Sequence, residues 1–459
     1  MNGEGRMFKR LVLPLAAILL LAFLGVELFR IGPPPEIMIT PALPAIGRRT
    51  PVEISLSEPK RGLSFVRVEW LQGDRIELLA ERSYETPPAF AFWNRGTSTD
   101  TLQIEVGRDT VQGLRAQHLV IRVTAGRAGT WLRRPVPAVE NLAVPVRLHP
   151  PSLQVMSTQT YAAQGGCEAV VYRVGDTAVR DGVRAGDWWF PGYPLPGGTG
   201  QERFALFALP YDQSSPQARL KAEDDAGNEA ESAIVDRFFP RSPRTDIIEL
   251  SDSFLNKVVP EIMAQTPDLA DQGTLLDNYL AINGDLRQRQ DEELKALAGK
   301  SRPEFLWHQP FLMMPNAQVM ASFAERRTYK YQGRVVDQQV HLGYDQAAVR
   351  RAPVPAANDG LVVLARYFGI YGNTVILDHG CGLMTVYGHL STISVAEGGT
   401  IARGQVLGQT GETGLAGGDH LHFAILLHGL PVTPVEWWDG HWIRDRIARK
   451  LGGAWQFQY

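Results

Sequence analysis

Apolar residues follow four successive patterns along the chain, and each pattern predicts a different kind of structure. They are nearly continuous from Leu11 to Phe29, alternate with polar residues between about 36 and 240, and recur at helical spacings between about 241 and 304. Glycines and β-branched residues dominate the remainder. We therefore expect a mainly β chain with an apolar N-terminal helix, a long β region, a short helical stretch and a second β-rich region.

The apolar run near the N-terminus is long enough to cross a membrane. About 20 apolar residues span a bilayer, and positive residues stay on its cytoplasmic side; Arg6, Lys9 and Arg10 precede this run. A cleaved signal peptide has a similar layout, but no small-x-small site follows the run, which leads into a Gly-Pro-Pro-Pro segment. We expect residues 1–35 to form a cytoplasmic stub, a single-pass anchor in the cytoplasmic membrane and a Pro-rich spacer, with a signal peptide as the alternative. The bulk of the chain would then lie on the periplasmic or extracellular side.

Two β-sandwich modules are expected between residues 36 and 240. Alternation at a period of two, with breaks every ~8–12 residues, is typical of such modules. The stretch ending in Asp225-Ala226-Gly227-Asn228 resembles the end of a bacterial immunoglobulin-like module. We place the modules at 36–148 and 149–240. The alternating triplets are Val52/Ile54/Leu56, Val66/Val68/Trp70, Leu102/Ile104/Val106, Leu119/Ile121/Val123 and Val170/Tyr172/Val174.

A helical connector is expected at residues 241–304. Three stretches, 251–264, 274–283 and 285–298, carry apolar residues at helical spacings. Ser251 and Asp285 are suitable N-caps and Gly299 is a suitable stop. The expected role of the connector is spacing.

Composition narrows the class of protein. The chain has 459 residues, of which 44% are hydrophobic and 21% charged, so roughly two to four globular domains are expected. A formal net charge of −3 argues against a general nucleic-acid binder. Cys167 and Cys381 lie far apart in the sequence, so there is no disulfide framework, and a single bridge between them stays open.

Candidate chemistry is concentrated near the C-terminus, where eight of the ten histidines follow residue 300. Residues i and i+2 of a strand share a face, so His420 and His422 would project into one groove. A catalytic zinc site needs three protein ligands and one open position. His341, Asp345 and one histidine of the pair supply that set. The histidines without ligand spacing, which we expect at the surface, in packing or at a strand end, are His308, His379, His428 and His441.

Residues 318–438 resemble an M23 (lysostaphin/LytM-type) zinc metallopeptidase domain in the order and spacing of their motifs. The resemblance implies an antiparallel β metallopeptidase domain, which we place at 305–459. It implies one Zn²⁺ held by His341, Asp345 and His422, with His389 and His420 as catalytic histidines. Which histidine acts as the base stays open. The matching runs are His341-x-Gly-x-Asp345, Ala352–Ala357, Asp359-Gly360, Tyr371–Val375, Tyr387–Ser391, Gly404–Gly408, Gly411-x-Thr413-Gly414 and His420–Phe423.

Two residues differ from the pattern of the M23 family, and two arginines follow the first of them in the sequence. Ala324 stands where many relatives have glycine, and Tyr344 replaces a small aliphatic residue. Both are expected to affect substrate preference more than catalysis. Arg326 and Arg327 are expected to be solvated surface charges, with contact to substrate carboxylates as the alternative.

These features together predict a membrane-anchored zinc metalloendopeptidase that hydrolyses peptide bonds in peptidoglycan stems or cross-links. One alternative is a non-hydrolytic LytM-type regulator that activates another cell-wall hydrolase. Another is an envelope scaffold whose β modules bind envelope proteins. No nucleic-acid partner is expected.

Overall fold

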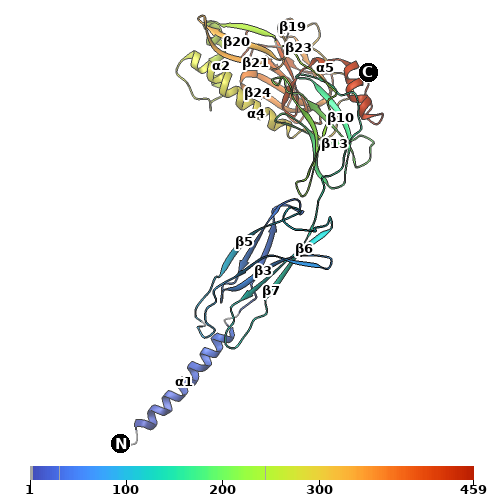
Figure 1. The fold of residues 1–459 in the computed structure, drawn as a ribbon. Coiled ribbons are helices and arrows are strands. Elements are labelled where there is room, and N and C mark those ends of the chain that lie inside the picture. Colours follow the sequence, from blue (N-terminus) through green and yellow to red (C-terminus); the bar gives the residue numbers. More distant parts are fainter. Residues whose placement is uncertain (1–3, 30–31, 92, 243, 459) are drawn as a thin grey trace. The chain divides into compact units, whose positions relative to one another are not determined.

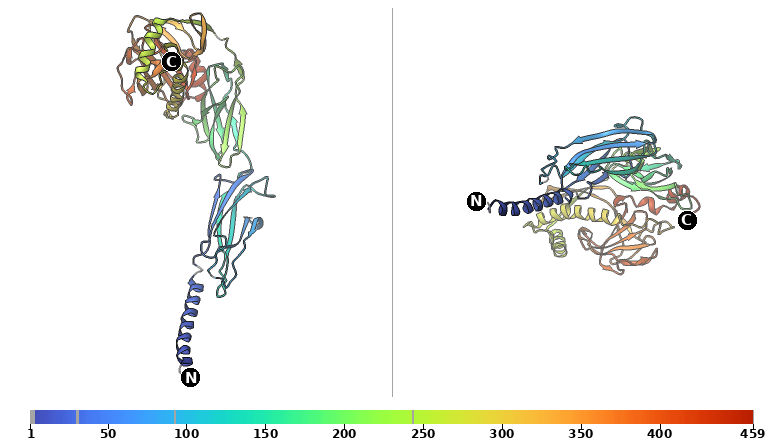
Figure 2. Two further views of the ribbon diagram at one scale, coloured as in Figure 1. Left: turned by 90° about the vertical axis from the view of Figure 1, so that its left-hand side faces the viewer. Right: turned by 90° about the horizontal axis from the view of Figure 1, so that it is seen from below.

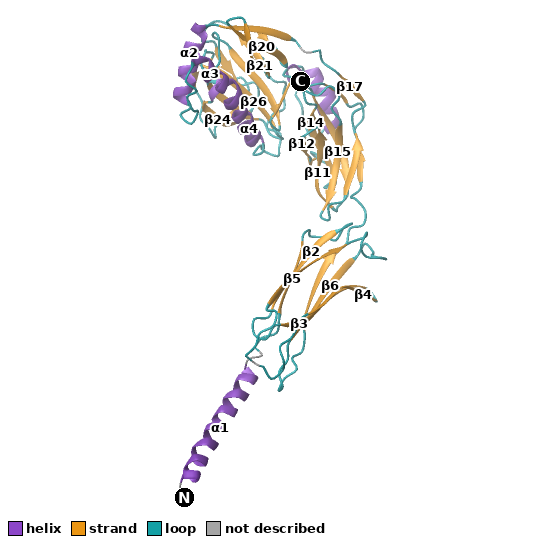
Figure 3. Cartoon of the chain, turned by 60° about the vertical axis from the view of Figure 1, so that its left-hand side comes forward, coloured by secondary structure: helices purple, strands orange, loops and turns teal. Residues whose placement is uncertain are grey.

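The computed structural model describes residues 4–29, 32–91, 93–242 and 244–458. The chain divides into two compact units: unit 1 comprises residues 1–151, 177–179 and 223–229, and unit 2 comprises the remainder. Strands dominate both units, while helices occur at the N-terminus and within unit 2 (Figure 3). The prediction of a mainly β chain is confirmed.

The N-terminal apolar run forms helix α1 (Glu4–Phe29). The segment Val12–Phe29 of this helix has a mean hydropathy of 2.5, and only 6% of the segment is buried. Its length and composition fit a single-pass anchor, and an N-terminal signal sequence would have the same properties.

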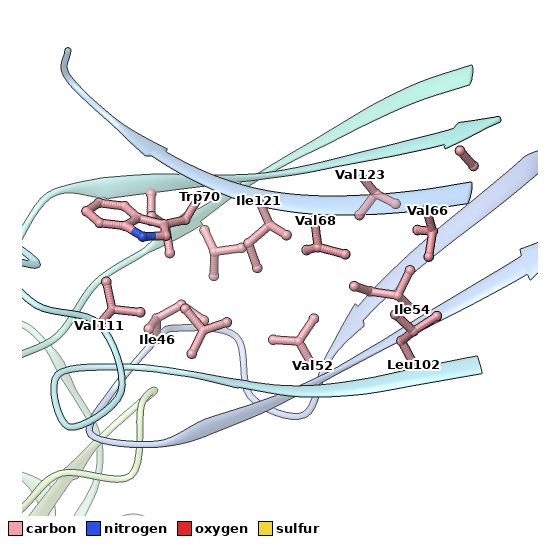
Figure 4. Packing of buried hydrophobic residues seen from close by; sticks show 14 of the residues in the cluster. Ile46, Val52, Ile54, Val66, Val68, Trp70, Leu102, Val111, Ile121 and Val123 are labelled. Carbon is pink, nitrogen blue, oxygen red and sulfur yellow. The ribbon is translucent and has the colours of Figure 1, made fainter. Parts of the chain in front are cut away.

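Two sheets form the β region of unit 1, and they enclose one apolar core. Alternation places Val52 and Ile54 on the inner face of one sheet and Val66, Val68 and Trp70 on the inner face of the other (Figure 4). All five are at most 1% exposed, and full burial of each such side chain contributes about 1.5–3 kcal/mol. The first sheet has the order β1 (Glu36–Pro41), β2 (Thr50–Ser57), β5 (Thr99–Val106), and the second β4 (Arg75–Ser83), β3 (Leu63–Gln72), β6 (His118–Arg127), β7 (Ala138–Pro145).

Residues 153–239 contain two further four-stranded sheets and a short parallel pair. The predicted Asp-Ala-Gly-Asn turn joins β15 to β16: Asp224 Oδ1 accepts from the N–H groups of Ala226 and Asn228 at 3.0 and 2.9 Å. An immunoglobulin-like topology stays a prediction. The sheets are β13 (Tyr193–Pro194), β14 (Glu202–Ala208), β10 (Cys167–Val174), β8 (Leu153–Val155), then β12 (Trp188–Pro191), β11 (Ala178–Ala185), β15 (Ala218–Asp224), β16 (Glu229–Ala233), with β9 (Tyr161–Ala163) beside β17 (Arg237–Phe239).

The helical segment has two of the three predicted boundaries. Ser251 Oγ accepts from the N–H of Phe254 and caps α2 (Asp252–Gln265), and Gly299 ends α4 (Arg287–Ala298). The prediction that Asp285 is an N-cap is wrong. Thr274 caps α3 (Leu275–Ala281), which runs through a π-helical turn (Ile282–Leu286) directly into α4, because one apolar face continues across the turn.

This segment also packs into the domain that follows it. Strand β18 (Thr245–Leu250) pairs in parallel with β20 (Glu325–Tyr331), which pairs with β21 (Arg334–His341). Val258, Ile262 and Ile282 form one buried cluster with Tyr329 and Ile370. In the views of unit 2, α2 and α4 lie along one side of the strands of this domain (Figures 1 and 2). The segment therefore adds a strand and a helical wall to the C-terminal domain, beyond the expected spacing role.

A large antiparallel sheet forms the centre of the C-terminal domain, as the resemblance implied. Its middle strands are fully buried, which is why apolar residues occupy most of their positions rather than every second one. The order is β19 (Gln318–Ala321), β22 (Tyr344–Ala347), β30 (Leu421–Leu427), β26 (Leu383–Leu390), β25 (Asn373–Asp378), β24 (Gly360–Tyr367), β28 (Thr400–Ile401), with β31 (Leu430–Val432) on β30. A smaller sheet contains β23 (Pro353–Pro355), β29 (Val406–Gln409) and β27 (Thr392–Ile393), and the short helices α5 (Val435–Trp438), α6 (Gly440–Ile443) and α7 (Arg449–Leu451) follow, the last two joined by a π-helical turn (Arg444–Ala448).

Both cysteines are buried and free, so the bridge left open by the sequence is not formed. Cys167 lies instead beside Glu436 of α5: its N–H donates to the Glu436 carboxylate at 2.7 Å. A Cβ at Gly166 would lie 2.3 Å from the same carboxylate, so any other residue there would have to displace the Glu436 side chain. Burial raises the pKa of Glu436 to about 8, although the Cys167 N–H acts in the opposite direction.

The free energy of unfolding of unit 2 should therefore fall as pH rises and the Glu436 carboxyl loses its proton. The folded protein keeps this carboxyl protonated up to about pH 8, whereas the unfolded chain releases the proton above about pH 4.3. The folded state thus binds the extra proton between these values, and stability declines as pH rises through the window. We expect Glu436→Gln to be more stable than wild type by about 1–2 kcal/mol at pH 8, with the gain vanishing near pH 4. Urea unfolding at both pH values measures it, with exposed Glu292→Gln as the control; an equal gain at both would contradict the titration.

Candidate metal centre

Three side chains converge where the chain passes from one sheet to another. His341 ends β21, Asp345 lies on β22, and His422 lies on β30 directly opposite Asp345. Side chains that face each other across antiparallel strands share a face of the sheet. His341 Nε2 and His422 Nδ1 lie 2.9 and 3.0 Å from Asp345 Oδ1, and 3.2 Å from each other.

These spacings fit a tetrahedral zinc site. With bonds of ~2.0–2.1 Å, neighbouring ligand atoms lie about 3.3 Å apart, close to the observed separations. His341 Nδ1 lies 3.1 Å from the carbonyl oxygen of Ser322, and donation to that carbonyl leaves Nε2 free to bind a metal. A Cβ at Gly343 would lie 2.6 Å from the His422 ring. The glycine of the His-x-Gly-x-Asp motif is therefore needed so that the backbone can approach this ligand.

Two further histidines line the same cavity. His420 and His389 have their ring centroids 4.8 Å apart. The Nδ1 atom of His420 lies 2.8 Å from the carbonyl oxygen of Gly418, and the Nδ1 atom of His389 lies 2.8 Å from the carbonyl oxygen of Thr413. Because a carbonyl only accepts, the Nδ1–H tautomer follows, and each Nε2 is left as a proton acceptor.

A β-bulge turns His389 toward the cavity. In the register of β26 and β30, Gly388 faces His422, so regular alternation would send His389 to the opposite side of the sheet. Opposite β25, however, Gly388 and His389 together occupy the space of Thr374 alone, and His389 takes φ 62°. Such a bulge re-aims a side chain. Sequence spacing contains no signal for it.

Electrostatics keep the ligand set ready for a metal. Burial alone would raise the pKa of Asp345, but His341, His420 and His422 together hold it well below its usual range. Burial lowers the pKa of His422 to about 4 against the opposing effect of Asp345. A carboxylate and a neutral imidazole at neutral pH are the forms that bind zinc.

The two outer histidines differ from one another. Burial, with His420 and His422 nearby, lowers the pKa of His389 well below its ordinary value. Burial opposes protonation of His420 as well, but Asp345 outweighs it and raises the pKa of His420; His420 Nε2 lies 3.6 Å from Asp345 Oδ1. His420 is therefore the histidine that accepts a proton more readily.

The prediction that Arg327 is a solvated surface charge is wrong. Its side chain is 17% exposed and donates to Asp345 Oδ2 at 3.1 Å, so it is no solvated surface charge. The strand alternation of β20 turns it inward, and Arg326, next to it, is exposed. Holding the second oxygen of Asp345 orients the first toward the histidines.

The departures at Ala324 and Tyr344 lie outside the cavity lining. Ala324 adopts φ 62°, the left-handed region in which glycine is favoured, and its N–H donates to the carbonyl oxygen of His341 at 2.8 Å. Alanine there costs about 1 kcal/mol of backbone strain. The ring of Tyr344 packs edge-on against Trp438 at 5.2 Å.

The remaining histidines sit apart from the centre. His379 follows β25, as predicted, and is buried between the Asp359 carbonyl and the Thr385 hydroxyl. His428 is half-buried in the turn between β30 and β31, and its ring stacks on Tyr193. Neither lines the cavity that contains the His341–Asp345–His422 group.

That cavity has a volume of about 350 Å³ and is walled partly by the helical segment. Glu249, Phe254, Tyr279 and Arg287 line it together with the five predicted site residues. Sequence reasoning missed these wall residues, and it also missed Tyr371, whose ring lies 5.5 Å from His422. Tyr371 lies within one of the matching motif runs, so that motif was an available signal; the wall residues had none.

The His-Asp-His group, with two histidines beside it, is a group that could hold a metal ion. Residues 339–434 match the model of Peptidase family M23, so the chain carries an M23 peptidase domain at its C-terminus.

Comparisons with individual proteins cover the same region. DD-carboxypeptidase/endopeptidase Mpg of Neisseria meningitidis is 42% identical over 21% of this chain and 22% of that protein. Peptidoglycan DD-endopeptidase ShyA of Vibrio cholerae is 37% identical over 26% of this chain and 27% of that protein. The catalytic domain of lysostaphin from Staphylococcus simulans is 23% identical, with a TM-score of 0.21, over 31% of this chain and 96% of that chain. The similarity thus spans about a quarter of the length of the curated relatives.

Proposed function

We propose that this protein is a membrane-anchored zinc metalloendopeptidase that cleaves peptide bonds in peptidoglycan. The observation that carries the proposal is the convergence of His341, Asp345 and His422 with two histidines whose Nε2 atoms are free to accept protons. The relatives named as peptidoglycan DD-endopeptidases support the substrate class. Helix α1 supports a membrane anchor, and the β modules follow it in the sequence before the catalytic domain.

His341, Asp345 and His422 would hold the zinc ion. Zinc, when bound, supplies Lewis acidity that activates water and polarises the scissile carbonyl. His420 then serves as the proton acceptor for the attacking water, and its imidazolium is stabilised by Asp345, 3.6 Å away. The same Nε2 returns the proton to the leaving amine. His389 stays neutral beside it and orients polar groups through its own Nε2.

The intact histidine set distinguishes this proposal from a regulator without hydrolytic activity. We expect the purified full chain, in detergent and loaded with zinc, to release defined peptides from purified muropeptides, with products identified by mass. Removal of zinc with a chelator should abolish release, and added zinc should restore it. A zinc-loaded protein that releases no peptide but stimulates a separate wall hydrolase would replace this proposal with the regulatory one.

A further inference from the structure

Two arginines line the metal cavity outside the ligand set. Arg327 comes from β20, and Arg287 comes from the first turn of α4. Both lie outside residues 339–434, the part that matches the M23 family. The cavity lining also contains two carboxylates, Glu249 and Asp345. The arginines balance these two charges, so a divalent cation at the ligand set makes the cavity net positive.

Arg287 is held in place by a buried amide. Its Nε donates to the backbone carbonyl of Asn283 at 3.1 Å, and its guanidinium also donates to the Asn283 side-chain oxygen. Asn283 is fully buried, and its Nδ2 donates to Asp337 Oδ2 at 2.6 Å. A guanidinium has five N–H donors, so these bonds leave several for a ligand in the cavity.

The helical segment that carries Arg287 forms hydrogen bonds and an ion pair with the loop that precedes His420. Lys257 of α2 lies 2.7 Å from Glu412, and Glu261 accepts from the N–H of Gly414 at 2.9 Å. The Tyr367 hydroxyl donates to the same carboxylate of Glu261 at 3.1 Å. These contacts fix the helical wall relative to the metal ligands, and the 350 Å³ cavity between them suits only a short stretch of peptide.

We propose that Arg287, which lines the same cavity as Arg327, forms a subsite for a free carboxylate of the peptide substrate. The inference rests on the proposed function and adds a substrate requirement to it. A planar guanidinium binds carboxylate in a bidentate manner, and the net-positive cavity favours an anion over a neutral amide. The carboxylate has two sources: the C-terminus of an uncrosslinked stem peptide, or the branching diamino acid of a cross-link.

Matched substrates test the subsite on the zinc-loaded full chain. Each source is represented by two peptides of identical sequence, one with the free carboxylate and one with the carboxamide. We expect wild type to favour the carboxylate at least 10-fold in kcat/KM for the source that it uses. Arg287→Ala and Arg287→Gln should reduce this preference to less than about 3-fold, mainly through loss on the carboxylate substrate. Arg289→Ala removes an exposed arginine of the same helix, α4, that pairs with Asp268 of a loop, and this variant should keep the preference.

Binding supplies a readout independent of turnover. In the His420→Ala background, the carboxylate peptide should bind at least 10-fold more tightly than its amide, and Arg287→Gln should remove the difference. Cleavage of both peptides at equal rates by wild type would overturn the subsite while leaving the peptidase intact. A preference that survives in both Arg287 variants, with unchanged melting temperature, would also overturn it. Cleavage of no peptide would instead refute the proposed function, leaving the binding assay to decide on the subsite.

Discussion

Asp345→Asn is expected to lose stoichiometric zinc and to lower kcat/KM by at least about 10³-fold. Asp345 Oδ1 lies within 3.0 Å of both candidate histidine ligands, and its second oxygen is bound by Arg327. The amide keeps the shape of the side chain but removes the charge, so the metal loses its anionic ligand while the fold keeps a polar partner for Arg327. Zinc content by mass spectrometry and competition with a chelator measure the loss.

Zinc-dependent stability gives a second measure of the same change. A ligand present at 1,000 times its Kd stabilises the folded state by ~4 kcal/mol, so wild type should melt at a higher temperature with zinc than without it. Asp345→Asn should show little of this shift. Asp268→Asn, an exposed aspartate paired with Arg289, is the matched control and should retain zinc, activity and the shift. An Asp345→Asn protein with full zinc content and activity within ten-fold of wild type would refute the assignment of this ligand.

His420→Ala is expected to separate catalysis from metal binding. His420 belongs to the same cavity, but it lies outside the group of three whose ligand atoms converge. Loss of a general base typically lowers the rate by ~10²–10⁴-fold. We therefore expect kcat to fall in that range while zinc content stays at one per chain. The variant should also lose the acidic limb of the pH profile of kcat/KM, because that limb reports protonation of the base in the free enzyme.

The matched substitution is His441→Ala, at an exposed histidine in α6. It should leave kcat, zinc content and the pH profile unchanged. Loss of zinc from His420→Ala would make His420 a ligand and return the role of base to His389. Retention of wild-type kcat would remove His420 from the mechanism altogether.

The helical segment changes how the catalytic domain is understood. Its periodicity and caps predict helices, and Ser251 and Gly299 act as the sequence indicates. Nothing in that periodicity says what the apolar face covers. The structure packs it on β20 and on the loop at Ile370, so that α2, α3 and α4 form a wall of the metal cavity.

The sequence by itself determined the parts of this protein that depend on local pattern. Period-two alternation specifies two faces of a strand, which placed Val52, Ile54, Val66 and Val68 in a core. The motif spacings selected the five residues that meet in the cavity. Apolar length alone identified α1.

Tertiary structure decided which face His389 points to, where Arg327 lies and what closes the cavity. A bulge of one residue reverses a side chain, and it depends on pairing between β25 and β26 rather than on either strand alone. Arg327 is mostly withdrawn from solvent because Asp345, 18 positions away, neutralises it. Arg287 reaches the cavity because α4 packs against a strand far along the chain. Each outcome rests on contacts between distant segments, and local periodicity carries no information about such contacts.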